Sequence, residues 1–422
     1  MTDYKKDLKI AVLGLGYIGL PTAAMFASRG VHVLGYDVNE SVVTSLNKGE
    51  ITIEEPFLDD LVRQVVSSGR LKASTVLEEC DVFIIAVPTP IKKDKGADMS
   101  YVASATEAIV PFLRKGNIVI LESTSPPGST EDIIVPILKK SNLNIGEDVF
   151  VAHSPERVIP GRILIELVEN DRIVGGINDA STKAVKKLYE IFVKGEIFKT
   201  DSKTAEMCKL MENTFRDVNI ALANELAKLC ENMGINAWEV IELSNKHPRV
   251  NLHQPGPGVG GHCLAVDPWF IVEKDPAAQI IKLSRETNDS MPEHVMHRIQ
   301  RILPDGQGKV AILGLTYKPN IDDMRESPLV DLVNELKAHT KYTLSLHDPY
   351  APQNGELVED VYEAVTGADL MVLGVHHDRF KDLDFEKVAS LMKTKRIFDT
   401  RNVLDHKALE ALGFEVTLLG RA

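Results

Sequence analysis

Short runs of consecutive apolar residues, separated by segments with helical spacing, make up most of the hydrophobic pattern of this chain. In the N-terminal part these runs cover residues 9–13, 31–36, 81–87, 117–121 and 149–152. Runs of this length that are apolar throughout are typical of strands buried on both faces of a parallel sheet. Segment 21–29, between the first two runs, has helical character and ends at Gly30. The pattern therefore predicts an α/β fold with a doubly wound sheet.

The turn after the first predicted strand carries a glycine pattern that is typical of dinucleotide binding. Gly14, Gly16 and Gly19 form GxGxxG, and Asp37 follows the next strand, 18 residues after the last glycine. In such a Rossmann-like unit the glycines allow a tight turn and bring the pyrophosphate to the helix N-terminus, while the acid accepts a hydrogen bond from the ribose. Because a carboxylate there repels a 2′-phosphate, the pattern predicts NAD rather than NADP.

The C-terminal part repeats this pattern at an offset of 300 residues. The segment 9–19, KIAVLGLGYIG, aligns with 309–319, KVAILGLTYKP, and further runs at 368–375 and 396–399 predict a second sheet of the same kind. Thr316, Lys318 and Pro319 replace Gly16, Ile18 and Gly19, so the dinucleotide pattern is lost. We expect a nucleotide site of another kind, with Lys318 on a phosphate; the alternative is a purely structural domain.

Between the two repeats, residues 204–234 predict one long helix that ends at a glycine. Lys209, Asn213 and Arg216 share one face of it, which is either functional or simply solvated. Such a helix belongs to the core or carries a dimer contact. We predict two Rossmann-like doubly wound domains, residues 1–200 and 303–422, joined by a central helical domain, residues 201–302.

Polar residues follow several predicted strands of the N-terminal sheet. Thr89, Thr124 and Glu156 come after the strands at 81–87, 117–121 and 149–152. Ligands of a doubly wound sheet collect at the carboxyl ends of its strands, so these residues are site candidates. The alternative for each threonine is a turn residue that caps a helix.

The central domain contains a loop of glycine and proline, residues 255–270, with Cys263 inside it and Asp267 four residues later. Glycines let backbone N–H groups approach a ligand, and a helix that begins near Cys263 would favour its thiolate. The alternative is a surface loop with an incidental cysteine. Just before the loop, Lys246, His247 and Arg249 form a basic cluster suited to a phosphate or a sugar hydroxyl.

The composition of the chain limits the classes of molecule that it is expected to bind. The formal net charge of −13 disfavours nonspecific binding to nucleic acid or to an anionic membrane. The four cysteines have no zinc-like spacing, so we predict no metal and a reduced, cytoplasmic setting. We also find no signal peptide and no apolar run long enough to span a membrane.

Taken together, the motifs resemble the UDP-glucose/UDP-N-acetylmannosamine 6-dehydrogenase family over essentially the whole chain. They are GLGYIGLP from Gly14, PTP from Pro88, EST from Glu122, SPERVIPG from Ser154, AEMCKLMENTFRDVNIALANEL from Ala205, KHPRVN from Lys246, GPGVGGHCLAVDPWF from Gly256 and GLTYKPNIDDMRESP from Gly314. The resemblance implies a cysteine-based enzyme that oxidises the C6 alcohol of a UDP-sugar to the carboxylate with two NAD.

The resemblance also implies residue roles. Cys263 is the expected nucleophile, Lys209 works with the substrate oxygen, Asn213 and Asp267 support them, and Glu156 handles water. Thr124 is a further expected catalytic residue. The expected NAD contacts are Tyr17, Ile18, Asp37, Thr89, Thr124 and Arg325. The expected UDP-sugar contacts are Arg157, Val158, Lys209, Asn213, Arg216, His247, Arg249, Gly260, Tyr317, Lys318 and Arg401. Some of these come from the neighbouring subunit in relatives, so we expect a homodimer.

The resemblance favours an N-acetylated sugar. UDP-glucose members usually carry a second glutamate four residues after Glu156, where this chain has Pro160. We therefore expect UDP-N-acetylmannosamine, with UDP-N-acetylglucosamine and UDP-glucose as alternatives. Two other classes stay open: a two-electron NAD-dependent hydroxyacid dehydrogenase and a nonenzymatic nucleotide-binding protein. The number of NADH formed per substrate separates them.

Overall fold

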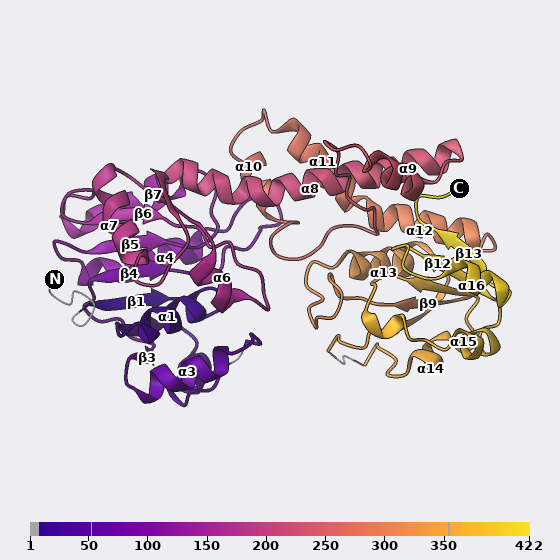
Figure 1. The fold of residues 1–422 in the computed structure, drawn as a ribbon, viewed down its shortest axis with the longest axis horizontal. Coiled ribbons are helices and arrows are strands. Elements are labelled where there is room, and N and C mark those ends of the chain that lie inside the picture. The colour runs from indigo at the N-terminus through magenta and orange to yellow at the C-terminus, as the bar shows by residue number, and fades with distance from the viewer. Residues whose placement is uncertain (1–7, 52, 353–354) are drawn as a thin grey trace. The chain divides into compact units, whose positions relative to one another are not determined.

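The computed structural model describes residues 8–51, 53–352 and 355–422 of the chain. It divides into two compact units, one of Met1–Glu212 with Glu273–Asp275 and the other of Asn213–Val272 with Pro276–Ala422. Each unit contains one sheet with helices on both faces (Figure 1), which confirms the predicted fold class. The boundaries at residues 200 and 302 remain a prediction.

The N-terminal unit contains an eight-stranded sheet in the order β3-β2-β1-β4-β5-β6-β7-β8. Its neighbours run parallel except for β6 and β7, which are antiparallel. The strands are β1 Lys9–Leu13, β2 His32–Tyr36, β3 Leu71–Ser74, β4 Val82–Ile85, β5 Ile118–Leu121, β6 Phe150–His153, β7 Arg172–Gly176 and β8 Ile197–Asp201. All five strands predicted from apolar runs in this part are confirmed, whereas β3, β7 and β8 were not predicted.

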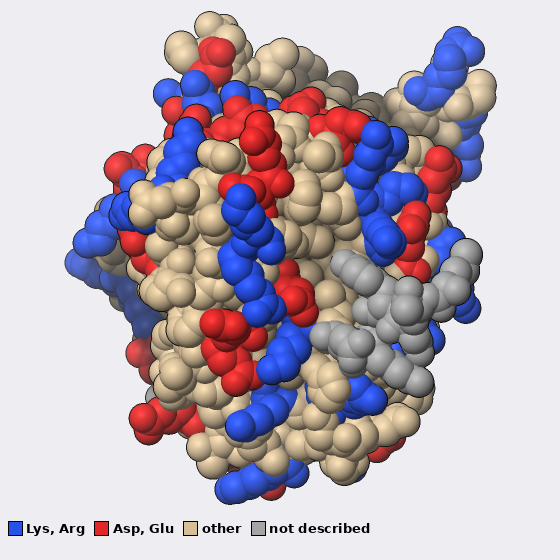
Figure 2. Space-filling view, turned by 90° about the vertical axis from the view of Figure 1, so that its left-hand side faces the viewer, with Lys and Arg blue, Asp and Glu red and all other residues tan. Residues whose placement is uncertain are grey.

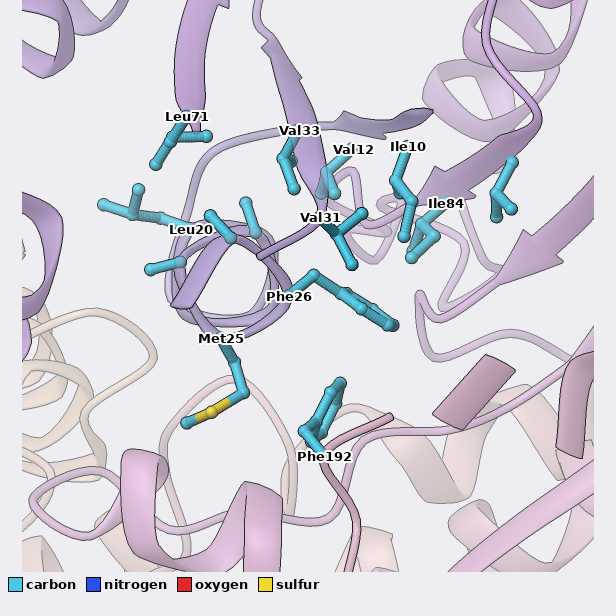
Figure 3. Packing of buried hydrophobic residues seen from close by; sticks show 14 of the residues in the cluster. Ile10, Val12, Leu20, Met25, Phe26, Val31, Val33, Leu71, Ile84 and Phe192 are labelled. Carbon is cyan, nitrogen blue, oxygen red and sulfur yellow. The ribbon is translucent and has the colours of Figure 1, made fainter. Parts of the chain in front are cut away.

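Helices cover both faces of this sheet because its strands are apolar on both sides. They are α1 Gly19–Ser28, α2 Glu40–Asn47, α3 Leu58–Ser67, α4 Ser100–Ile109, η1 Val110–Phe112, η2 Thr130–Ile134, α5 Val135–Leu138, η3 Lys139–Ser141, α6 Ile163–Glu169 and α7 Asp179–Tyr189. One core lies under α1, α3, α6 and α7, and the other under α4 and α5. In the first core Phe26 of α1 points to Phe192, with ring centroids 4.8 Å apart (Figure 3).

The C-terminal unit contains a five-stranded parallel sheet in the order β10-β9-β11-β12-β13. Its strands are β9 Lys309–Leu313, β10 Thr343–His347, β11 Leu370–Leu373, β12 Arg396–Asp399 and β13 Glu415–Leu418. Its sheet-covering helices are α12 Met291–Ile302, α13 Pro328–His339, α14 Val361–Val365, η4 Asp378–Phe380, α15 Phe385–Leu391 and α16 His406–Ala411. α12 and α13 cover one core, and α14 to α16 cover the other, so the predicted second doubly wound sheet is confirmed.

The predicted long helix is α8, Ser202–Met233, which has 32 residues. It is followed by α9 Ala237–Ser244, α10 Asp267–Val272 and α11 Gln279–Asp289. Within the described residues, no helix combines the length and the apolar character that crossing a bilayer requires. On the face drawn in Figure 2, basic and acidic side chains are interspersed among uncharged ones.

Candidate active site

The turn between β1 and α1 fits a dinucleotide. A Cβ on Gly19 would lie 1.8 Å from the carbonyl oxygen of Gly14, so only glycine allows α1 to start this close to the strand. A Cβ on Gly16 would have no heavy atom within 4 Å, so the chain leaves room beside this residue. The N-terminus of α1 also has no side-chain cap. The Leu20 amide donates to the carbonyl oxygen of Gly16 at 3.1 Å and Pro21 has no N–H, so a phosphate would bind to the backbone amides of the turn before Leu20.

Asp37 lies directly after β2, beside this turn. Its carboxylate accepts hydrogen bonds from the amides of Leu15, at 3.0 Å, and Asn39, at 2.9 Å. The side chain is only half-buried, so its remaining lone pairs are open to a ribose hydroxyl. In the same turn Tyr17 is exposed and Ile18 half-buried. The roles of these three residues as NAD contacts stay predictions.

The loops after β4 and β5 lie side by side. Thr89 Oγ1 donates a hydrogen bond to the carbonyl oxygen of Thr124, at 2.7 Å, and Ser123 Oγ donates to that of Val87, at 2.7 Å. The structure therefore brings the two predicted threonines together at the carboxyl edge of the sheet. Neither hydroxyl caps a helix, which was the alternative for each: Thr89 bonds across the loops, and Thr124 precedes η2 by six residues.

Glu156 and Arg157 follow β6, and both are held by partners that the sequence did not reveal. The Glu156 carboxylate pairs with the buried Arg172, which begins β7. Arg157 pairs with Glu212 of α8, with Nη1 and Oε1 2.7 Å apart, and the neighbouring Val158 packs against the core. These contacts fix the segment that contains three predicted site residues.

Lys209 is half-buried on α8, and α8 is anchored to the loop after β5. The carboxylate of Glu206, one turn before Lys209, accepts hydrogen bonds from the amide of Thr130, at 2.8 Å, and from its hydroxyl, at 2.6 Å. Burial, with a further contribution from the positive charge of Lys209, lowers the pKa of His153 at the end of β6 to about 3. The positive charge of Lys209 therefore acts on the end of β6, which precedes Glu156.

In the C-terminal unit, the structure brings Cys263, Asp267 and Asn213 into one cluster. Asn213 Nδ2 donates to Asp267 Oδ2 at 2.6 Å. The carbonyl oxygen of Cys263 accepts from the amide of Asp267 at 2.8 Å, which places the exposed cysteine one turn before α10. The two predicted supporting residues thus contact each other, and one of them begins the helix that follows the predicted nucleophile.

The glycines of the Cys263 loop serve close packing against the loop after β9. A Cβ on Gly260 would lie 2.2 Å from the carbonyl oxygen of Glu326, and one on Gly261 would lie 2.7 Å from the ring of Tyr317. The sequence links these glycines to an approaching ligand. The structure gives a different reason for them, which is close packing of the chain against itself. Cys263 and Tyr317, both predicted to act on the substrate, consequently lie on two loops that touch.

Two predicted cations, Arg401 and Lys318, lie on the loops after β12 and β9. The Arg401 guanidinium packs against Gly256, and its Nε donates to the carbonyl oxygen of Gly374 at 3.2 Å. Burial lowers the pKa of Arg401 to about 10, with Asp399 opposing the shift, so the side chain remains cationic at neutral pH. Lys318 is exposed on the loop after β9. Both are suited to a diphosphate.

The other predicted contacts lie on exposed segments. Arg325 donates to the carboxylate of Asp323, at 2.8 and 2.9 Å. Arg216 is exposed on α8, and His247 and Arg249 lie after α9, where their nearest ring and guanidinium nitrogens are 3.5 Å apart. Another partner of the Asp323 carboxylate is His262, next to Cys263, with Nε2 and Oδ2 3.5 Å apart. The roles of all four predicted contacts stay predictions.

The sequence matches three domains of one family in order. They are the NAD binding, central and UDP binding domains of the UDP-glucose/GDP-mannose dehydrogenase family, at residues 8–193, 203–290 and 311–406. A UDP-N-acetyl-D-mannosamine dehydrogenase of Methanocaldococcus jannaschii is 50% identical, with 100% of this chain and 99% of that protein covered.

Two further relatives show the same full-length similarity. An NDP-N-acetyl-D-galactosaminuronic acid dehydrogenase of Ralstonia solanacearum is 47% identical, with 95% of this chain and 97% of that protein covered. The structure of a UDP-N-acetyl-mannosamine dehydrogenase from S. aureus has a TM-score of 0.89 at 48% identity, covering 98% of this chain and 99% of that one. The chain thus belongs to the UDP-glucose/GDP-mannose dehydrogenase family and is an NAD-dependent nucleotide-sugar dehydrogenase.

Proposed function

We propose that this enzyme oxidises the C6 alcohol of UDP-N-acetyl-D-mannosamine to the carboxylate of UDP-N-acetyl-D-mannosaminuronate in the cytoplasm. The names of its relatives support an N-acetylated nucleotide sugar, and several of them, including the M. jannaschii protein, are named for the mannosamine substrate. Pro160, where UDP-glucose enzymes usually have glutamate, supports the same class of sugar. The alternatives are UDP-N-acetylglucosamine and UDP-glucose.

The observation that carries the mechanism is the position of Cys263. Its loop lies against Tyr317 of the predicted uridine domain, and the next turn is bonded to Asn213. An exposed thiol in this position can attack an aldehyde carbon while the nucleotide is held beside it. The aldehyde that the first oxidation yields would then stay bound as a thiohemiacetal on Cys263.

NAD, when bound at Gly14–Gly19 and Asp37, supplies the hydride acceptor for each oxidation. Lys209 takes the alcohol proton or stabilises the oxyanion, supported by Asn213 and Asp267. The second oxidation leaves a thioester on Cys263. Glu156 takes a proton from the water that hydrolyses it, and the thiolate leaves as the acid product forms.

The binding contacts belong to the same proposal. The predicted NAD contacts are Tyr17, Ile18, Thr89, Thr124 and Arg325, and the predicted UDP-sugar contacts are Arg157, Val158, Arg216, His247, Arg249, Gly260, Tyr317, Lys318 and Arg401. The chemistry of the predicted UDP-sugar contacts supports their assignment, since cations and hydrogen-bond donors recognise a diphosphate.

An NAD-reduction assay with the three UDP-sugars tests the substrate and the stoichiometry together. We expect two NADH per UDP-N-acetyl-D-mannosamine and slower reduction with the other two. One NADH per substrate would indicate a two-electron dehydrogenase instead, and faster turnover of UDP-glucose would overturn the choice of sugar.

The covalent step is tested with Cys263→Ser. This variant should form no uronic acid, because a hydroxyl at that place is a far weaker nucleophile at neutral pH. Cys208→Ser, on the half-buried cysteine of α8, is the matched control and should keep its activity. Acid formation by Cys263→Ser at the wild-type rate would exclude the cysteine mechanism.

We also propose a homodimer that buries one face of α8. Phe215, Leu222 and Leu229 recur every seven residues, so they share a helix face, and their side chains are 63%, 51% and 44% exposed. A second copy would cover this stripe with the same stripe about a twofold axis. Leu222→Arg should yield a monomer in light scattering, whereas Lys407→Glu on α16 should leave the dimer intact. A dimeric Leu222→Arg variant would contradict the proposal.

A further inference from the structure

Two buried carboxylates of the N-terminal unit share one guanidinium. Arg172 at the start of β7 pairs with Glu156 and lies 3.5 Å from Oε1 of Glu122, which follows β5. The side chains of Arg172, Glu122 and Glu156 are 4%, 0% and 8% exposed. Since burying charges is costly, a cluster of two acids and one base is an unusual way to join two strand ends.

Hydrogen bonds from other elements complete the cluster on the side of Glu122. Tyr189 of α7 donates its hydroxyl to Glu122 at 2.5 Å, and Thr22 of α1 donates at 3.3 Å. The guanidinium of Arg172 also stacks on the ring of Tyr189, 4.2 Å from its centroid. Glu122 is therefore fixed from three directions, whereas the other oxygen of Glu156 bonds to the amide of Arg157 at 2.8 Å.

We propose that Arg172 and Glu122 are positioning residues for Glu156, the predicted water-handling carboxylate. Arg172 holds the Glu156 carboxylate in place, and Glu122 competes with Glu156 for the same guanidinium. This inference rests on the proposed function, because it assigns a purpose to Glu156 only in hydrolysis of the Cys263 thioester.

The charges of Arg172, Glu122 and Glu156 bear on the hydrolysis of the Cys263 thioester. The water oxygen bonds to the thioester carbon, the carbon–sulfur bond breaks with both electrons on sulfur, and Glu156 accepts the proton of the water. When Glu122 is protonated, Arg172 pairs with the Glu156 carboxylate alone. When Glu122 is ionised, it competes for the same guanidinium, and the Glu156 carboxylate is held less tightly while it takes the proton of the water.

The groups that face Glu122 make this competition relevant near neutral pH. Burial raises the pKa of Glu122 to about 7; Arg172 opposes the rise and Glu156 adds to it, while the hydrogen bonds from Tyr189 and Thr22 lower it. Hydrolysis by the wild-type enzyme should thus accelerate as pH rises through about 7. Removing the titration of Glu122 should remove this dependence.

The experiment uses Glu156→Gln, Arg172→Lys and Glu122→Gln in the full-length enzyme with NAD and UDP-N-acetyl-D-mannosamine. Lysine keeps the charge of Arg172 but cannot contact two carboxylates with a planar fork. In Glu156→Gln and Arg172→Lys we expect a rapid burst of NADH, steady turnover lowered on the order of 100-fold, and an acylated Cys263 detected by intact mass. Glu122→Gln should lose the rise of hydrolysis with pH near neutrality.

Glu55→Gln is the control for loosening of the same loop. The Glu55 carboxylate accepts from the amides of Gly161 and Ile163, both at 2.7 Å, so it holds the other end of the segment after Glu156. This variant should lower the melting temperature without accumulation of the acylated enzyme. Accumulation in Glu55→Gln equal to that in Arg172→Lys would assign the effect to loop structure and overturn the inference.

The remaining outcomes separate the two proposals. Accumulation in Glu156→Gln with none in Arg172→Lys would overturn the positioning inference and leave the proposed function in place. Accumulation in neither would reject the water-handling role of Glu156 itself. If Arg172→Lys does not fold, the pH profile decides: an unchanged rise in Glu122→Gln overturns the inference, and its loss supports it.

Discussion

The two sheets of this protein begin with nearly the same sequence, but the aspartates after their second strands have different surroundings. Asp37 is half-buried and accepts from two amides. Asp348 is 1% exposed and is surrounded by donors. These are the amides of Leu315, Thr316, Tyr350 and Ala351 and the Nε2 of His377. The carboxylate oxygens of Asp348 are thus bonded to donors of their own domain, and of the two aspartates only Asp37 can still accept a hydrogen bond from a ribose.

The turns before these aspartates differ in the same sense. In the first copy, residues 14–18 separate β1 from α1, and the helix has no side-chain cap. In the second copy, residues 314–327 separate β9 from α13, and Ser327 caps the helix through its side chain. Thr316 is buried and donates to the carbonyl oxygen of Lys318 at 2.9 Å. The second copy has therefore filled, with its own side chains and backbone, the space that the first copy leaves open for a pyrophosphate.

The largest loss of stability is expected from Gly19→Ala in the first copy. The new Cβ would lie 1.8 Å from the carbonyl oxygen of Gly14, and no rotation can relieve a clash with backbone. We expect the free energy of unfolding of the N-terminal unit to fall on the order of 3 kcal/mol. NAD affinity should fall with it, as measured by urea unfolding and by fluorescence titration. A variant of wild-type stability would show that α1 does not need this approach.

The next largest effect is expected from Asp348→Asn. Burial alone would raise the pKa of Asp348, but the hydrogen bonds from His377, Leu315 and Tyr350 outweigh it and lower the pKa to about 2. The folded pKa thus lies below the model-compound value of 3.8. The aspartate therefore stabilises the fold fully above pH of about 4, and this contribution is lost as pH falls through about 2.

Asp348→Asn should destabilise the C-terminal unit by about 2 kcal/mol at pH 7, and the difference from wild type should shrink on acidification. Asp37→Asn is the matched control, because it should weaken NAD binding and leave stability within about 0.5 kcal/mol. Urea unfolding between pH 7 and 3, together with NAD titration, measures both. Equal destabilisation by the two substitutions would contradict the contrast between the aspartates.

Much of this fold follows from local patterns, because short apolar runs bounded by turn residues are typical of buried strands. The strands at 9–13 and 309–313 coincide with β1 and β9. The same reasoning did not predict β7, Arg172–Gly176, whose run is broken by an arginine at its first position and two glycines at its end. A buried arginine looks like a surface residue in sequence, since only its distant carboxylate partners explain its burial.

The site was predictable to a similar extent. The GxGxxG spacing and the cysteine in a glycine loop are local, and the family resemblance implied supporting roles for Asn213 and Asp267, whereas their mutual hydrogen bond was not predicted. Glu206, Arg172 and Asn224 were missed, since each acts through long-range contacts. The side-chain Oδ1 of Asn224, for example, accepts a hydrogen bond from the amide of Gly256 at 2.9 Å and so holds the start of the Cys263 loop. No spacing rule relates residues 32 positions apart on a helix and a loop.

The smallest effect on stability is expected from Gly16→Ala, and this variant separates cofactor binding from folding. The added methyl group meets no atom of the chain within 4 Å, so the free energy of unfolding should change by less than about 0.5 kcal/mol. If this space is kept for the pyrophosphate, the Michaelis constant for NAD should still rise about tenfold or more, since the methyl group prevents close approach to the backbone. Thr316→Gly in the second copy should do the opposite, because its buried hydroxyl bonds internally. Thr316→Gly should lower the free energy of unfolding without creating NAD affinity. Calorimetric titration of both variants with NAD measures the two effects. Unchanged NAD kinetics in Gly16→Ala would mean that the open space beside this glycine is not used by the cofactor.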